Sequence, residues 1–180
     1  MSRIGKKAVA ITDGADVKLN GNEIVVSKGK ATLKYTHRPE VTVKVDADAK
    51  QIIVDRIDDS RTAKAMHGTT RTLIANMIEG VTKGYTKQLE IVGVGWGAKQ
   101  QGMEVHLNVG FADTRKVPIP AGVEVKIEGQ KLTISGANKQ KVGECAAAIR
   151  QHKKPEPYNG KGIKYHDEII VRKQGKAFGS

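Results

Sequence analysis

The segment from Lys153 to Tyr165 concentrates the residue types that suit binding of a polyanion. It reads Lys-Lys-Pro-Glu-Pro-Tyr-Asn-Gly-Lys-Gly-Ile-Lys-Tyr, and its two prolines end a preceding helix and hold the chain extended. Glycines supply bare backbone, and two tyrosines can stack or hydrogen-bond. Four lysines can neutralise phosphates: Lys153, Lys154, Lys161 and Lys164. The alternative interpretation is a solvated loop whose lysines only aid solubility.

The composition of the whole chain favours the binding interpretation. Its 180 residues contain 31 Lys and Arg against 19 Asp and Glu, which gives a net charge of +12. Such an excess indicates a polyanionic partner, and nucleic acid is the commonest one. A basic tail with Arg172, Lys173 and Lys176 follows the segment. The sequence therefore predicts that the segment binds an anion.

Catalytic and metal-binding patterns are weak. Cys145 follows helical spacing beside alanines, which is typical of a small core residue rather than a nucleophile. The pairs Asp58-Asp59 and Asp167-Glu168 resemble acid/base pairs, but neighbours in sequence usually point apart, and the first pair suits a helix start. The five histidines show no metal-ligand spacing with the cysteine. We therefore expect no enzyme activity, no metal and no cofactor.

The run from Gly93 to Gly97 invites comparison with nucleotide-binding loops. It lacks the GxGxxG pattern and the Gly-Lys-Ser/Thr ending, and strand-like residues follow it instead of a helix. A glycine-rich strand or bulge is the favoured interpretation. The other possibility is that Trp96 provides a stacking surface for RNA.

Targeting and redox signals predict a cytoplasmic protein. A single cysteine excludes an intramolecular disulfide framework and suits a reducing compartment. The basic start of the chain leads into no apolar region typical of a secretory signal. No apolar stretch reaches the length of a membrane span, so we expect no membrane partner.

Two amphipathic helices are predicted to position these residues. Ser60 can cap the first, which should end between Gly80 and Gly84. Asn138 can cap the second, and Pro155 forbids its continuation. Apolar spacings of three and four define the buried stripes. These are Ala63, Met66, Thr70, Leu73, Ile74, Met77, Ile78 and Val81 in the first helix, and Val142, Cys145, Ala146 and Ile149 in the second.

An internal repeat predicts the architecture. Residues 9–27 match residues 117–135 without a gap at an offset of 108, and each copy reads as a β-hairpin around Gly21 or Gly129. Chance likeness between hairpins is the alternative to duplication. The fold class predicted is α+β, with two duplicated domains, 1–82 and 83–180, each a small mainly antiparallel sheet packed against one helix. Further strands are expected at Thr32–Tyr35, Val41–Val45, Gln51–Asp55, Lys87–Val92, Met103–Val109 and Ile169–Arg172.

Several segments resemble the bacterial large-subunit ribosomal protein L-six family. The segment Pro155–Tyr165 closely resembles the family's signature, and it is the most specific match. The other segments follow the family's order over essentially the whole chain: Met1–Lys6, Gly68–Leu73, Leu89–Gly95 and Gly136–Gly143. The chain departs from the family pattern at Trp96-Gly97, where an aromatic residue and Arg are usual. It departs again at Ala112-Asp113-Thr114, where Ser-His-Pro is frequent.

The resemblance implies a function and partners. A member of this family is a structural constituent of the large ribosomal subunit, in the cytoplasm. It binds large-subunit rRNA near the translation-factor-binding region and the sarcin–ricin loop, chiefly through the second domain. Neighbouring proteins at the stalk base and translation factors lie nearby. Carried over by motif and by the basic tail, the expected rRNA-binding residues are Lys153, Lys154, Tyr158, Lys161, Gly162, Lys164, Tyr165, Arg172 and Lys173.

Two other function classes stay open on the sequence alone. An RNA-modifying or nucleotide-using enzyme with a basic docking face would require a concave site with convergent polar groups, and the sequence shows no such set. A DNA-binding architectural protein is permitted by the charge. Binding to rRNA fragments and to duplex DNA at matched salt separates the last class from the first.

Overall fold

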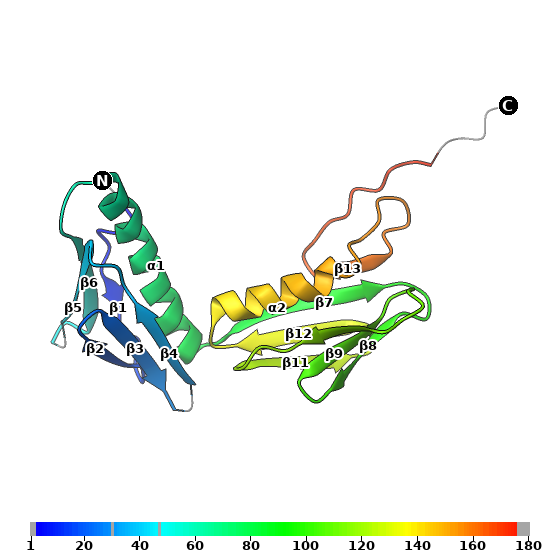
Figure 1. Ribbon diagram of the computed structural model, residues 1–180, viewed down its shortest axis with the longest axis horizontal. Helices are drawn as coiled ribbons and strands as arrows, with labels where there is room; N and C mark the ends of the chain where they lie inside the picture. Colours follow the sequence, from blue (N-terminus) through cyan, green and yellow to red (C-terminus); the bar gives the residue numbers. More distant parts are fainter. Residues whose placement is uncertain (1–2, 30, 47, 176–180) are drawn as a thin grey trace. The chain divides into compact units, whose positions relative to one another are not determined.

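The computed structural model describes residues 3–29, 31–46 and 48–175 (Figure 1). Lys176, which belongs to the predicted basic tail, lies outside the described residues, as do Met1 and Ser2. The chain divides into unit 1, residues 1–84 with 137–139, and unit 2, residues 85–136 with 140–180. Within the described residues each unit contains antiparallel sheets and one helix, which confirms the predicted α+β class with duplicated sheet-and-helix domains.

Unit 1 is built from two three-stranded antiparallel sheets and a helix. In chain order its elements are β1 (Val9–Ala10), β2 (Asp16–Asn20), β3 (Glu23–Lys28), β4 (Ala31–Thr36), β5 (Val41–Asp46), β6 (Gln51–Arg56) and α1 (Arg61–Thr82). One sheet has the strand order β1-β6-β5 and the other has β2-β3-β4. The turn between β2 and β3 contains Gly21 at φ +60°, a conformation that glycine adopts without strain.

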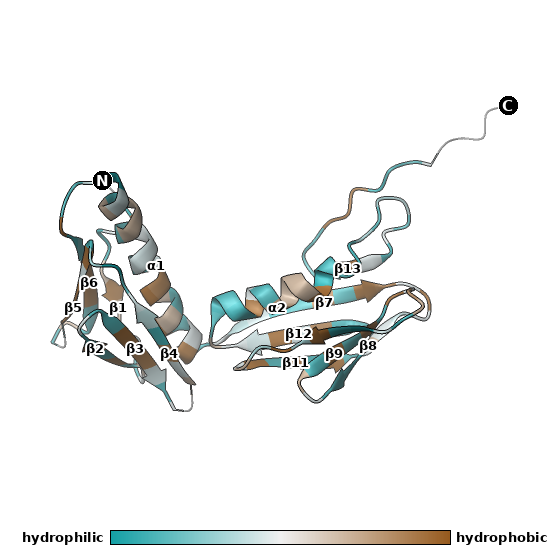
Figure 2. Ribbon diagram, viewed as in Figure 1, coloured by the Kyte–Doolittle hydropathy of each residue, from teal (hydrophilic) through white to brown (hydrophobic). Residues whose placement is uncertain are grey.

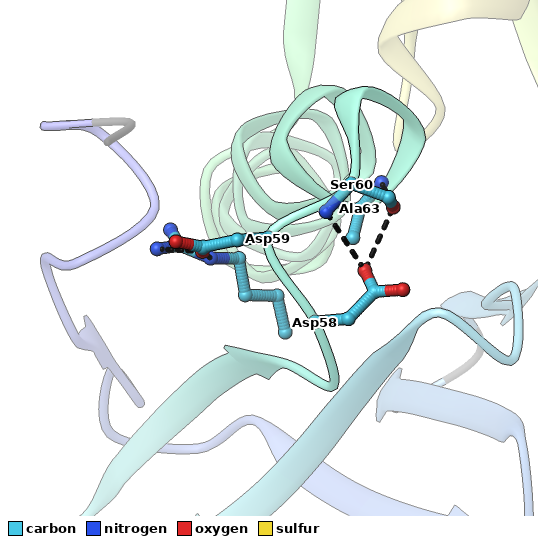
Figure 3. Close-up of polar contacts among 5 residues, drawn as sticks. Asp58, Asp59, Ser60 and Ala63 are labelled. Atoms are coloured by element: carbon cyan, nitrogen blue, oxygen red, sulfur yellow. Dashed lines mark hydrogen bonds and ion pairs between the residues drawn. The ribbon is translucent and has the colours of Figure 1, made fainter.

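Helix α1 begins where the sequence predicts. The Ser60 hydroxyl accepts a hydrogen bond from the amide of Ala63 at 3.1 Å. The Asp58 carboxylate accepts hydrogen bonds from the hydroxyl of Ser60 at 2.7 Å and from its amide at 3.1 Å, and these bonds lower the pKa of Asp58 (Figure 3). Asp59 pairs with Arg56 at 2.7 Å. Both carboxylates therefore organise the helix start.

The apolar faces of α1 and both sheets of unit 1 meet in one core. The helix packs against β6, β3 and β4, and Figure 2 shows apolar residues along α1 and β3. Most of the predicted stripe of α1 is buried, while Met66 and Leu73 are only partly buried. His67, outside the predicted stripe, is buried, and its Nε2 lies 2.8 Å from the carbonyl oxygen of Val54. The strand residues of this core are Val9, Ile24, Val26, Val41, Val43, Ile52 and Val54.

Unit 2 repeats this plan and adds a strand. In chain order its elements are β7 (Tyr85–Val92), β8 (Gly97–Gln101), β9 (Glu104–Asn108), β10 (Arg115–Pro118), β11 (Val123–Glu128), β12 (Lys131–Gly136), α2 (Lys139–Gln151) and β13 (Gly162–Tyr165). The sheets have the orders β10-β9-β8 and β11-β12-β7-β13. The predicted stripe of α2 is confirmed, because Val142, Cys145, Ala146 and Ile149 are all buried in the unit's core. There they join Leu89, Leu132 and Ile163 of the four-stranded sheet.

The two units repeat the same elements in the same chain order. The offset of 108 is therefore wrong, because it pairs hairpins that do not correspond. In unit 1 the hairpin β5–β6 pairs with the first strand, β1, and leads into α1; in unit 2 the hairpin β11–β12 pairs with β7 and leads into α2. The hairpin β2–β3 belongs to the other sheet and corresponds to β8–β9. The likeness of residues 9–27 to 117–135 therefore reflects hairpin chemistry, with Gly21 and Gly129 at φ +60° and +62° in the turns.

The last predicted strand is also wrong. Residues Ile169–Arg172 form no strand, although Ile-Ile-Val has strong β propensity. The strand lies earlier, at β13, where Gly162–Tyr165 pairs antiparallel with Val92–Leu89 of β7. Burial decides between the two segments, because Ile163 is fully buried while Ile169 and Val171 are 90% and 82% exposed. Propensity does not provide the backbone partners that an edge strand requires.

Candidate nucleic-acid interface

The basic segment folds as a closed turn that leads into β13. Three backbone hydrogen bonds join its two arms. The Glu156 amide donates to the Lys161 carbonyl at 2.9 Å, the Gly160 amide to the Glu156 carbonyl at 3.1 Å, and the Ile163 amide to the Lys153 carbonyl at 2.7 Å. Figure 1 shows this turn between α2 and β13. Side chains that project from the turn are therefore carried by an ordered backbone.

Gly162 has a packing role in place of the expected bare backbone. It is buried, with φ at +151°, and a Cβ atom built on it would lie 2.4 Å from the Cα of Pro155. Only glycine allows the two arms of the turn to approach so closely. Gly160 is likewise buried and has φ at +73°. Protein atoms cover both glycines in this structure, and the expected approach of their amides to a phosphate stays a prediction.

Lys164 already has a carboxylate partner within the chain. It lies directly opposite Glu90 on β7, and its ammonium group is 3.3 Å from the Glu90 carboxylate, with both side chains about a quarter exposed. His166 Nδ1 lies 2.6 Å from the same carboxylate. The hydrogen bond with His166, and then the one with Lys164, lower the pKa of Glu90 against the opposing effect of partial burial. Lys164 thus fixes β13 to β7.

Lys153 is held by aromatic rings. Its ammonium group lies 4.6 Å from the centre of the Phe111 ring and 5.5 Å from that of Trp96, within the range of cation–π attraction. The Trp96 ring packs against two glycines, because a Cβ atom built on Gly93 or Gly110 would lie 2.4 Å or 2.7 Å from it. The glycine run therefore makes room for Trp96, which packs against the core. This agrees with the favoured interpretation of close backbone packing.

Tyr165 is half-buried and also faces cations of its own chain. The guanidinium of Arg150 lies 5.6 Å from the centre of its ring. Glu168 receives hydrogen bonds from Arg150 Nη2 and from its Nε at 2.9 Å, and from the Tyr165 amide at 3.1 Å. The hydrogen bond from Arg150 is the main cause of the lowered pKa of Glu168. Glu168 therefore has a structural role. Arg150 here, and Glu90 beside Lys164, are site residues that the sequence did not predict.

A second group of the expected residues points to solvent. We call it the outward set, and it consists of Lys154, Tyr158, Lys161, Arg172 and Lys173, all exposed. The Lys173 amide donates to the carbonyl of Pro157 at 2.8 Å, which fastens the C-terminal stretch to the turn. The Arg172 guanidinium lies beside Gly160, 3.5 Å from where a Cβ would stand. Within the described residues, no carboxylate forms an ion pair with these four cations.

The remaining chemistry-bearing candidates have structural roles. Cys145 is buried, and burial raises the pKa of its thiol, which opposes nucleophilic activity. Across the residues that the structure describes, no three His, Cys, Asp or Glu side chains gather as metal ligands would. Neither helix of this part of the chain combines the length and hydrophobicity that crossing a bilayer requires.

Comparison with known proteins identifies relatives over nearly the whole chain. The family described as "Ribosomal protein L6" matches residues 11–84 and 92–166, that is, once in each unit. The chain belongs to this family. The "Large ribosomal subunit protein uL6" of Caldicellulosiruptor bescii is 50% identical over 178 residues, which cover 98% of this chain and 97% of the relative. The protein of the same name from Persephonella marina is 46% identical over 180 residues, covering 99% of each.

Membership of the family confirms two predictions. The resemblance of the Pro155–Tyr165 segment and the other quoted segments to this family was correct. The relatives are structural ribosomal proteins, so the prediction that the chain is not an enzyme is also confirmed. The two matched segments start at residues 11 and 92, which agrees with duplication in chain order and not with the offset of 108.

Proposed function

We propose that this chain is a structural component of the large ribosomal subunit that binds large-subunit rRNA through the outward set of unit 2. One observation carries the proposal. Four cations and a half-exposed tyrosine gather on the closed turn and on the C-terminal stretch fastened to it, and the cations have no carboxylate partner among the described residues. Their charge is available to phosphates, and Tyr158 is available to a base or a 2′-hydroxyl. The two curated relatives carry the name of a large-subunit protein.

The binding region is proposed to be the sarcin–ricin loop and the nearby translation-factor-binding region. This part rests on the resemblance of Pro155–Tyr165 to the signature of the family. Neighbouring large-subunit proteins at the stalk base are the protein partners, and translation factors bind close by. Recognition is mainly of backbone and shape, because the deep major groove of A-form RNA hides the base edges from side chains. The role in translation is architectural.

A binding experiment tests both parts of the proposal. The purified chain is titrated with an rRNA fragment that contains the sarcin–ricin loop and with a fragment of equal length from elsewhere in the same subunit, over a series of salt concentrations. We expect tighter binding to the first fragment. The double variant Lys154→Ala with Lys161→Ala should flatten the logarithmic salt dependence by about two units, one for each lost phosphate contact.

The control variant is Lys18→Ala with Lys34→Ala. It removes the same charge from exposed lysines of unit 1, on β2 and β4. We expect its salt dependence to stay close to that of the unchanged chain. Equal affinity for both fragments would reject the location, whereas absence of binding to either fragment at low salt would reject rRNA binding itself.

A further inference from the structure

The two sheets of unit 2 present polar faces with different charge patterns. On the four-stranded sheet, residues directly opposite one another form a row across the strands: Glu128, Lys131, Glu90 and Lys164. The signs alternate, so each charge has an opposite neighbour on the next strand. This face therefore offers a polyanion little excess charge.

The three-stranded sheet β10-β9-β8 carries a basic row instead. Lys99 and Lys116 lie opposite His106, one on each side. Val105 and Leu107, which flank His106 along β9, are fully buried, so His106 and its row face away from the core. Both lysines are exposed. Because opposite residues of antiparallel strands lie about 5 Å apart, the row brings two permanent charges and an imidazole within about 10 Å.

Hydrogen-bonding groups surround this row. A hollow of about 370 Å³ lies on the same face, and its lining includes Trp96, Lys99, Gln101, His106, Asn108 and Thr114. Side-chain amides and a hydroxyl donate to phosphate oxygens and exchange hydrogen bonds with a 2′-hydroxyl. Such groups beside lysines form a surface suited to the sugar–phosphate backbone of RNA.

Opposing charge on this face is small. The carboxylate of Glu104 lies 3.2 Å from His106 Nε2, and that of Asp113 lies 3.4 Å from Arg115. Neither carboxylate pairs with Lys99 or Lys116, and no other carboxylate in the described ranges does so. The two lysines are therefore available to an anion.

From this pattern we propose that the face of β10-β9-β8 bearing Lys99, His106 and Lys116 is a second RNA-binding surface, which contacts the rRNA backbone. The proposal rests on the proposed function, which supplies rRNA as the partner. Trp96 lies beside both this face and the start of the basic turn that carries part of the outward set. Its side chain lines the hollow on this face, and Lys153 at the start of the basic turn lies over its ring. One folded RNA can therefore contact both surfaces.

Paired double variants test this proposal. Lys99→Ala with Lys116→Ala removes the two lysines of the basic row, and the control Lys18→Ala with Lys34→Ala removes the same charge from exposed lysines of unit 1. For the first we expect rRNA affinity to fall about tenfold and the salt dependence to flatten by about two units. The control should change affinity less than about twofold, because its lysines belong to neither proposed binding surface. Thermal unfolding verifies that both variants are folded.

The pattern of RNA protection separates this proposal from the proposed function. The Lys99/Lys116 variant should lose protection of nucleotides that differ from those lost in the Lys154/Lys161 variant. If the unchanged chain binds rRNA and only the Lys154/Lys161 variant weakens, the second surface is rejected and the proposed function stands. Loss of ribosome association with an unchanged footprint and salt dependence would show a protein partner on this face, which also overturns the proposal.

Discussion

Two pairs of lysines on the same basic turn have opposite surroundings. Lys154 and Lys161 are exposed and lack a carboxylate partner among the described residues. Lys153 lies over the rings of Phe111 and Trp96, and Lys164 pairs with Glu90. The four residues are equivalent in a count of charge. In the structure, the inner pair, Lys153 and Lys164, holds the turn in place. The outer pair, Lys154 and Lys161, is available to an anion.

This difference shows that charge in a sequence is not the same as charge available to a ligand. A lysine that already has a partner contributes to the stability of the fold, and a ligand must displace that partner to use it. The inner pair matters for binding through the backbone that it positions. Variants of the two pairs should therefore separate into effects on unfolding and effects on RNA binding.

The largest effect is expected from breaking the turn that carries both pairs. Gly162→Ala would place a Cβ atom 2.4 Å from the Cα of Pro155, at a φ of +151° that favours glycine. Backbone atoms cannot give way as a flexible side chain can. We expect a loss of about 3 kcal/mol in the free energy of unfolding, measured by urea denaturation, together with weaker RNA binding.

The control for this variant is Gly143→Ala in α2. A Cβ atom at Gly143 would meet no atom within 4 Å, and alanine favours the helix, so we expect a gain of about 0.5 to 1 kcal/mol. If Gly162→Ala unfolds like the unchanged chain, the arms of the turn are not packed as the structure shows. The stabilising role of the inner lysines would then lose its basis.

The sequence predicts those features of this arrangement that are determined by residues close together in the chain. Helix starts and stripes follow from Ser60 and the apolar spacing, and both helices were predicted close to their observed bounds. The strand at β13 was missed because Gly162 and Lys164 do not read as a strand, and it exists through pairing with β7. The partner of Lys164 is Glu90, distant in sequence, so no local pattern indicates that this lysine is paired.

A smaller effect is expected when one lysine of the inner pair is compared with one lysine of the outer pair. Lys164→Met keeps the aliphatic stem and removes the ion pair with Glu90, which should lower the free energy of unfolding by about 1 kcal/mol. Lys161→Met, at an exposed position, should change it by less than about 0.5 kcal/mol. RNA titrations should show the reverse order, with the salt dependence flattened by about one unit in Lys161→Met only. Identical behaviour of the two variants in both measurements would erase the distinction between the pairs.

The smallest effect concerns Glu168, which holds Arg150 beside Tyr165 at the end of β13. Its pKa is lowered in the folded chain, chiefly by the hydrogen bond from Arg150. The stabilisation is therefore complete above the ordinary carboxylate pKa and is lost as the pH falls through the lowered value, because the unfolded chain takes up the proton first. The Glu168→Gln variant lacks this stabilisation at every pH.

Urea denaturation at neutral pH and in acidic steps measures this difference. Glu168→Gln should be less stable than the unchanged chain by up to about 1 kcal/mol at neutral pH, since both side chains are 24% exposed, and the gap should close in acid. Asp13→Asn is the control, because Asp13 and its partner Lys50 are 92% and 69% exposed and should contribute almost nothing at any pH. A gap that widens in acid would mean that folding raises the pKa of Glu168, which would contradict its ion pair with Arg150.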